Sequence, residues 1–154
     1  MSTEPDDRIA LASDHAGFKV KEKLKTLLDR REVPYEDLGA PELEPSDDYP
    51  VFAARLGRAV AGGSFRRGIA VCGSGIGASM TANRFKGVRA ALCVTPEMAK
   101  LSRLHNDANV LVLGERVTPD ECVEEILDAW LDTGFEAGRH QRRVLLIDEL
   151  GGNG

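Results

Sequence analysis

Hydrophobic and polar positions along the chain follow two alternating patterns. Short apolar runs, several of them rich in β-branched residues, are typical of buried strands. Between them, apolar residues recur at spacings of three and four, as on the buried side of an amphipathic helix. The predicted strands span residues 8–13, 35–38, 69–72, 88–94 and 109–113, and the predicted helices span residues 18–31, 51–61, 78–84, 96–105, 118–131 and 139–150.

Strand and helix alternate throughout, and each connection is long enough to cross over a sheet. The sequence therefore predicts an α/β fold, a single-domain, three-layer, Rossmann-like sandwich with a five-stranded parallel sheet and helices on both faces. We expect residues 8–150 to form this domain, with residues 1–7 and 151–154 as disordered ends.

Composition narrows the class of protein. The chain has 154 residues, of which 42% are hydrophobic and 29% charged, as is usual for a soluble globular domain. A net charge of -5 argues against nucleic acid as the main partner. No apolar run is long enough for a membrane span, and the acidic start MSTEPDD is unlike a signal peptide. Three cysteines in no metal-like spacing favour reduced thiols in a cytoplasmic protein.

Unusual residues stand at the carboxyl ends of the predicted strands. Asp14 and His15 follow the first strand, Cys72 ends the third, and Glu115 and Arg116 follow the fifth. Ligands of parallel α/β sheets bind beyond these ends of the strands. We therefore expect these residues to form one site.

A glycine-rich turn joins the third strand to the next helix. The segment GSGIGA after Cys72 fits the dinucleotide-binding fingerprint, although no acidic residue closes the following strand. Such a turn aims several backbone N–H groups and the positive end of a helix dipole at one point, which suits an anion. A cradle for a phosphate or an enediolate fits better than a site for NAD, and a tight turn without a ligand is the alternative.

Each candidate side chain also has a structural interpretation. Cys72 is either a buried small residue or a thiolate favoured by the nearby helix start. Asp14 is a good helix N-cap, and a role in the site is compatible with capping. His105 near a helix end could simply complement the dipole. Arg139 and Arg143, four residues apart on one helix face, could grip a phosphate or form a solvated basic surface.

Together these residues resemble the type B ribose-5-phosphate isomerases, a family that includes galactose-6-phosphate and allose-6-phosphate isomerases. The resemblance covers residues 8–150 and rests on several motifs in order. These are SDHAGF, DYP, CGSGIG, AN-F-G-RA, SR-HND-NVL-LG-R, DAWL and GRH--RV.

The resemblance implies an aldose–ketose isomerase without metal or cofactor, in which Cys72 is the base that moves a proton between C1 and C2. Some relatives use a glutamate where this chain has Ala78, which favours Cys72 here. Ser74 is expected to assist proton movement between the oxygens, and Asp14, His105 and Asn106 to handle ring opening and sugar hydroxyls. The remaining expected substrate contacts are His15, Tyr49, Gly73, Gly75, Ile76, Gly77, Arg116, Arg139, His140 and Arg143.

The resemblance further implies a homodimer, possibly paired into a tetramer, with the site at the interface. His105 and Asn106 would come from the neighbouring subunit, and the C-terminal helix would serve dimer contacts. The expected reaction interconverts D-ribose 5-phosphate and D-ribulose 5-phosphate in the pentose phosphate pathway. An isomerase of a six-carbon sugar phosphate and a non-enzymatic phosphosugar- or nucleotide-binding module are the alternatives.

Overall fold

The computed structural model describes residues 6–151 and has a five-stranded parallel sheet at its centre. The strand order is β2-β1-β3-β5-β4, and Ile69 in β3 lies opposite Leu11 in β1 and Leu111 in β5. The strands are β1 (Asp6–Ser13), β2 (Tyr35–Asp37), β3 (Phe65–Cys72), β4 (Ala90–Leu92) and β5 (Val110–Gly114).

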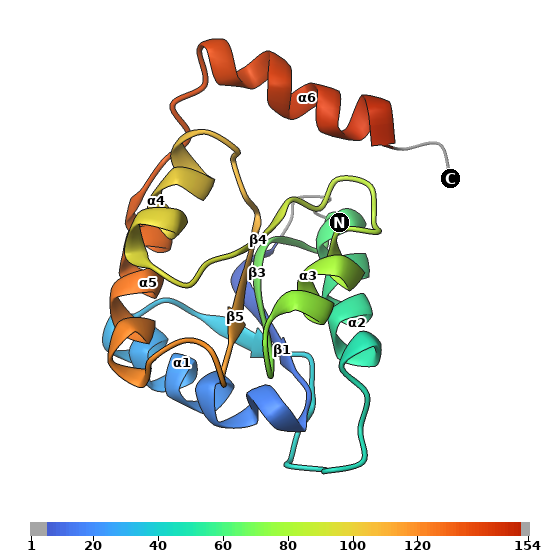
Figure 1. Ribbon diagram of the computed structural model, residues 1–154, viewed down its shortest axis with the longest axis vertical. Coiled ribbons are helices and arrows are strands. Elements are labelled where there is room, and N and C mark those ends of the chain that lie inside the picture. The colour runs from blue at the N-terminus through green and yellow to red at the C-terminus, as the bar shows by residue number, and fades with distance from the viewer. Residues whose placement is uncertain (1–5, 152–154) are drawn as a thin grey trace.

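Helices cover both faces of the sheet, as Figure 1 shows, so the predicted three-layer fold is confirmed. Alternate strand residues point to opposite faces. Leu11 and Leu111 therefore pack with α1, α4 and α5, while Ala12 and Val112 pack with α2 and α3. The helices are α1 (Phe18–Arg30), α2 (Tyr49–Ala61), α3 (Ile76–Ala82), α4 (Pro96–Leu104), α5 (Asp120–Asp132) and α6 (Arg139–Gly151), and a short 3-10 turn, η1 (His15–Gly17), precedes α1.

The last helix lies apart from the three layers. In Figure 1, α6 lies across the end of the sheet at which the strands begin, beside the end of α4. The backbone N–H of Glu136 donates to the carbonyl of Leu104 and fixes the approach to α6. Only His140 and Val144 of this helix are buried. Most of α6 is therefore free to contact another molecule.

The ends of the domain differ from the sequence prediction. Asp6 already pairs with Phe65, so residues 6 and 7 belong to β1 and are not part of a disordered segment. Gly151 is the last residue of α6 and not the first residue of a frayed tail. Residues 1–5 and 152–154, the rest of the predicted disordered ends, lie outside the described part of the chain. Across residues 6–151, no helix combines the length and the apolar character that a membrane crossing requires.

The strand order places a crevice between two central strands. The chain leaves β1 toward β2 on one side of the sheet, whereas it leaves β3 toward β4 on the other side. Loops diverge at such a switch point and leave room for a ligand at the carboxyl ends of the two strands. Asp14 follows β1, and Cys72 is the last residue of β3, so both lie at this point.

Candidate active site

A cavity of about 580 Å³ opens at the switch point between β1 and β3. This size suits a small phosphorylated metabolite. The cavity brings together residues from four separate segments of the chain, including most of those predicted from the first half of the chain. Its walls are formed by Asp14, His15, Ala16, Tyr49, Cys72, Gly73, Ser74, Ile76, Gly77, Met80, Arg116 and Val117.

The sulfur of Cys72 lies inside the turn that follows it. The side chain is 4% exposed, and Sγ accepts a hydrogen bond from the backbone N–H of Gly75 at 3.2 Å. An N–H aimed at sulfur favours negative charge on that atom. Gly75 has φ +80°, a conformation that glycine adopts without strain and that turns its N–H back toward the sulfur. The loop thus holds the Cys72 sulfur at the cavity with a hydrogen-bond donor aimed at it.

Two of the loop amides serve the loop itself. The N–H of Gly75 is engaged by the sulfur of Cys72, and the N–H of Ile76 donates to Ser74 Oγ at 3.1 Å. The predicted cradle of backbone N–H groups therefore does not include these two. Gly75 is buried and does not belong to the cavity wall. The first-turn amides of Gly77 and Ala78 have no carbonyl partner within α3 and are better placed to meet an anion.

Tyr49 reaches the glycine loop from the first residue of α2. A Cβ on Gly77 would lie 2.3 Å from Tyr49 Cε1, so only glycine allows the ring to approach this closely. The sequence placed the start of this helix at Val51. In the structure Pro50 occupies the first turn, where its missing N–H costs no helical hydrogen bond, and the helix begins two residues earlier.

Asp14 and His15 lie together at the end of β1. Asp14 is 5% exposed, and its Oδ1 accepts a hydrogen bond from the Gly17 N–H at 3.1 Å, so it caps the short turn η1 and not α1 itself. Burial raises the pKa of Asp14. His15 Nδ1 lies 2.8 Å from Oδ1 of Asp47, and this hydrogen bond raises the pKa of His15.

The two residues after β5 have different roles. Arg116 lies over Gly73, because a Cβ on that glycine would be 3.3 Å from a guanidinium nitrogen, and it lines the cavity. Glu115 was expected in the same site. Instead its Oε1 accepts a hydrogen bond from the Val20 N–H at 2.9 Å, in the first turn of α1. This oxygen satisfies an otherwise unpaired helix donor, and Glu115 is not among the residues that line the cavity.

The other predicted residues lie at the opposite end of the sheet. Cys72 pairs with Gly114 at the carboxyl end of β5, whereas His105 and Asn106 precede the amino end of that strand. Figure 1 shows α6, which carries Arg139, His140 and Arg143, at this second end. One chain therefore does not bring these five residues into the cavity that Cys72 lines, and the α6 arginines do not enclose it.

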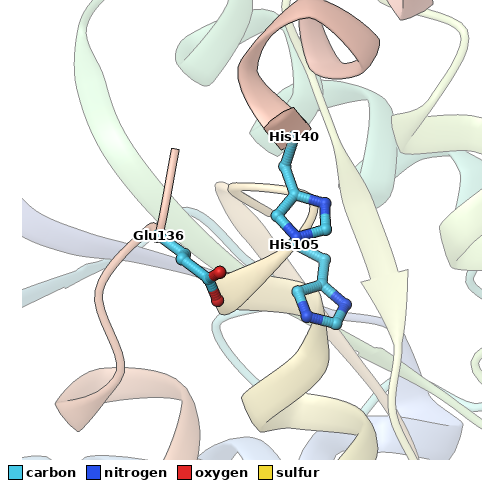
Figure 2. Close-up of side chains that lie close together, drawn as sticks. All are labelled: His105, Glu136 and His140. Carbon is cyan, nitrogen blue, oxygen red and sulfur yellow. The ribbon is translucent and has the colours of Figure 1, made fainter. Parts of the chain in front are cut away.

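His105 and His140 form a stacked pair, which Figure 2 shows together with Glu136. The ring centroids are 4.2 Å apart and the ring planes differ by 19°. Burial, with His105 as a further cause, lowers the pKa of His140. Two neutral rings, or one neutral and one charged ring, can stack in this way. Two imidazolium rings would repel each other.

Two side-chain clusters have the composition of metal sites. Potential ligand atoms of His105, Glu136 and His140 lie within 4.8 Å of one another. Lone pairs of imidazole lie in the ring plane, so two nearly parallel stacked rings do not converge on one ion. In the second cluster, Asp14, His15 and Asp47, the His15 Nδ1 is already hydrogen-bonded to a carboxylate. Neither arrangement favours a metal, and the lack of a metal or cofactor stays a prediction.

Three cavity residues, and one residue that contacts a cavity residue from behind, were not predicted from the sequence. Ala16, Met80 and Val117 are ordinary residues whose only signal is proximity to a motif. Asp47 precedes the DYP motif in an acidic loop, and no pattern in the sequence links it to His15. Such contacts depend on the fold of a loop and not on periodicity.

Comparison with known proteins identifies the family. The model of the ribose/galactose isomerase family matches residues 9–147. Ribose-5-phosphate isomerase B of Escherichia coli is 46% identical over 93% of this chain and 95% of its own length. A putative sugar phosphate isomerase of Bacillus subtilis is 42% identical over 92% of this chain and 95% of its own length.

Solved structures agree with this result. The ribose 5-phosphate isomerase of Thermotoga maritima superposes with a TM-score of 0.88 at 46% identity and covers 92% of this chain and 97% of its own. Ribose-5-phosphate isomerase B of Mycoplasma genitalium, solved with bound ribulose-5-phosphate, has a TM-score of 0.91 at 38% identity and covers 98% and 100%. The motifs, the cavity at the switch point and these matches together place the chain in the ribose/galactose isomerase family, as the sequence predicted.

Proposed function

We propose that this enzyme interconverts D-ribose 5-phosphate and D-ribulose 5-phosphate through a cis-enediolate. The proposal rests on one observation above all, the placement of Cys72 in a cavity that also contains His15 and Arg116. A base and two basic side chains in one cavity match a substrate with an acidic carbon at one end and a phosphate at the other.

The reaction needs one base and a set of hydrogen-bond donors. The Cys72 thiolate removes the proton from C2 of the open-chain aldose, a C1–C2 double bond forms, and the carbonyl electron pair moves to O1. The O2 proton is transferred to O1, and the thiol then returns its proton to C1 as the C2 carbonyl forms. Ser74 can carry the proton between the oxygens, because its Oγ accepts from Ile76 and its O–H remains free to donate.

The anionic intermediate is stabilised by donors fixed before the reaction. The amides of Gly77 and Ala78 lie in the first turn of α3, directly after the loop that Cys72 begins, and one such donor is worth roughly 3–4 kcal/mol in other enzymes. Asp14, which burial favours in its protonated form, is placed to exchange a proton during ring opening.

A second copy of the chain would complete this site. Four apolar or aromatic side chains around the cavity are exposed, and three more are exposed on α6. An exposed apolar surface of this kind usually marks an interface. In a homodimer, the α6 end of one subunit would carry its arginines and His105 to the cavity of the other. The exposed residues are Tyr49, Ile76, Met80, Val117, Leu145, Ile147 and Leu150.

The reaction is best tested with two substrates in parallel. We expect a higher kcat/KM with ribose 5-phosphate than with allose 6-phosphate, and exchange of the C2 proton with solvent in deuterated water. A preference for the six-carbon sugar would identify the alternative substrate, and the absence of both turnover and exchange would favour a binding module.

We place the enzyme in the cytoplasm, since Cys72, Cys93 and Cys122 are all unbridged.

A further inference from the structure

Asp47 contacts His15 from a loop 32 residues further along the chain. Its Oδ1 accepts a hydrogen bond from the His15 backbone N–H at 2.9 Å and lies 2.8 Å from the ring Nδ1. The Asp47 side chain is only 10% exposed, and its Oδ2 is buried without a partner among residues 6–151. An enclosed carboxylate is costly unless a positive charge balances it. The His15 ring is the group in position to do so.

Charged groups face the His15 ring from three loops. Asp14 precedes it, Asp47 reaches it from the loop before α2, and Arg116 reaches it from the loop after β5. The hydrogen bond that the His15 ring donates to Asp47 is the main reason that the pKa of His15 lies above 6.5. Asp14 adds to this rise, while burial and Arg116 oppose it. Tyr49 and Cys72, from α2 and β3, are the other titratable groups of the same cavity.

The hydrogen bond to Asp47 also decides what the ring can offer a ligand. With its Nδ1–H committed to Asp47, a neutral ring would present a lone pair at Nε2. A lone pair repels a phosphate oxygen, whereas an imidazolium presents an N–H that forms a charge-assisted hydrogen bond. Asp47 therefore acts on both the orientation and the charge of His15.

We propose that Asp47 is a positioning residue for phosphate binding, which holds His15 as an imidazolium with its Nε2–H directed to the phosphate of the sugar. This inference rests on the proposed function, because it assigns the phosphate to the end of the cavity that His15 and Arg116 line. Asp47 acts through His15 and does not itself touch the substrate.

Three variants separate this role from a merely structural one. Asp47→Asn keeps the size of the side chain and can still accept the backbone N–H but removes the charge. Asp47→Glu keeps the charge and serves as the rescue. Glu42→Gln removes one negative charge from an exposed position of the same loop and is the matched control.

The measurements are KM and kcat for ribose 5-phosphate between pH 5.5 and 9, with an NMR titration of the His15 ring in each variant. Above pH 6.5, at the pH where the two profiles differ most, we expect Asp47→Asn to raise KM roughly tenfold with a much smaller change in kcat, as for the loss of one charge-assisted hydrogen bond. Below pH 6.5, where a histidine without Asp47 is also protonated, the difference in KM should shrink. Asp47→Glu should recover most of the affinity, and Glu42→Gln should match the unmodified enzyme.

Superimposable pH profiles of KM for the unmodified enzyme and Asp47→Asn would overturn the proposal, as would a fall in kcat at constant KM. If Asp47→Asn does not fold, the titration of the unmodified enzyme decides, and a His15 that titrates at or below 6.5 refutes the idea. Binding of inorganic phosphate, followed by the His15 signal, is independent of the sugar. If the enzyme does not turn over ribose 5-phosphate but Asp47→Asn binds phosphate more weakly, the proposed function fails and the inference stands.

Discussion

The chemistry assigned to Cys72 depends on its position at the end of a buried strand. Cys93, also at a strand end, is 1% exposed, and burial raises its pKa to about 11. Near neutral pH that thiol carries its proton and has no nucleophilic or basic role. Cys72 is nearly as buried, yet it lines the cavity and receives the Gly75 N–H on its sulfur. The two thiols therefore differ in their surroundings, because the glycine loop places only the Cys72 sulfur at the cavity and aims an N–H group at it.

Replacing Cys72 with alanine should abolish isomerisation while substrate binding persists. A general base contributes about 10²–10⁴-fold to rate, so we expect kcat to fall by about 10³-fold or more. The Kd of ribose 5-phosphate, measured by calorimetry, should change little, because the phosphate contacts remain. Cys122→Ser, on α5 and away from the cavity, is the control and should retain full activity. Near-native kcat in the Cys72 variant would refute its role as the base.

The Tyr49 ring at the start of α2 packs directly on Gly77 at the end of the glycine-rich turn. In Gly77→Ala the new methyl group would lie 2.3 Å from the ring of Tyr49, so ring and loop must separate. Overpacking of this kind costs about 1–3 kcal/mol of unfolding free energy. We expect a lower Tm and a higher KM, measured by thermal denaturation and steady-state kinetics.

Two further variants test that explanation of Gly77→Ala. Gly134→Ala places a methyl group where no atom lies within 4 Å, and should leave both Tm and KM unchanged. Adding Tyr49→Ala to Gly77→Ala removes the ring and should restore most of the lost stability, though not KM. A double variant as unstable as Gly77→Ala would show that the clash with Tyr49 is not the cause.

An ion pair between Lys21 and Asp37 joins α1 to β2. Lys21 is fully buried, and its Nζ lies 2.9 Å from Oδ1 of Asp37, which Lys25 also contacts at 2.7 Å. Burial alone would raise the pKa of Asp37, but the ammonium groups of Lys25 and Lys21 hold it below 3.8. Because the folded-state pKa is depressed, the stabilisation is present above 3.8 and is lost as the pH falls through the lower folded value.

Asp37→Asn should therefore cost about 2–3 kcal/mol of unfolding free energy at pH 7, since it leaves the buried Lys21 ammonium without its counterion. Urea denaturation at pH 7 and at a pH well below 3.8 measures this loss, which should decrease toward acid. Glu36→Gln, on the same strand with an exposed ion pair, should cost less than about 0.5 kcal/mol. An equal loss for Asp37→Asn at acid and neutral pH would contradict the electrostatic explanation.

Sequence patterns predict the bounds of helices and strands more accurately than the contacts between them. Predicted and observed bounds of α1, α4 and α6 agree to within one residue, because each helix has a regular apolar face or a proline at its start. The start of α2 was missed because Asp48, Tyr49 and Pro50 have the composition of a loop. The pairing of His15 with Asp47 and the capping of α1 by Glu115 join segments far apart in sequence, and no periodicity encodes them.

At the scale of the whole molecule, the predicted site residues divide into two groups. One group lines the cavity beyond β1 and β3, and the other lies at the amino end of the sheet and on α6. A family resemblance can assign all of these residues to one site, but a single sequence cannot show that one fold separates them. In a two-fold symmetric dimer, each end of one subunit would face the opposite end of its partner.

Mixing two defective variants tests this arrangement directly. Cys72→Ala removes the proposed base from the cavity, and Arg143→Ala removes an expected phosphate contact from α6. If each site combines the cavity of one subunit with α6 of the other, a mixed dimer has one doubly defective site and one intact site. After subunit exchange at equal concentrations, about half of the dimers are mixed, and the mixture should recover about a quarter of the unmodified kcat/KM. Sites complete within one chain would give only the mean of the two parent activities, and that result, with exchange verified by native mass spectrometry, would exclude a shared site.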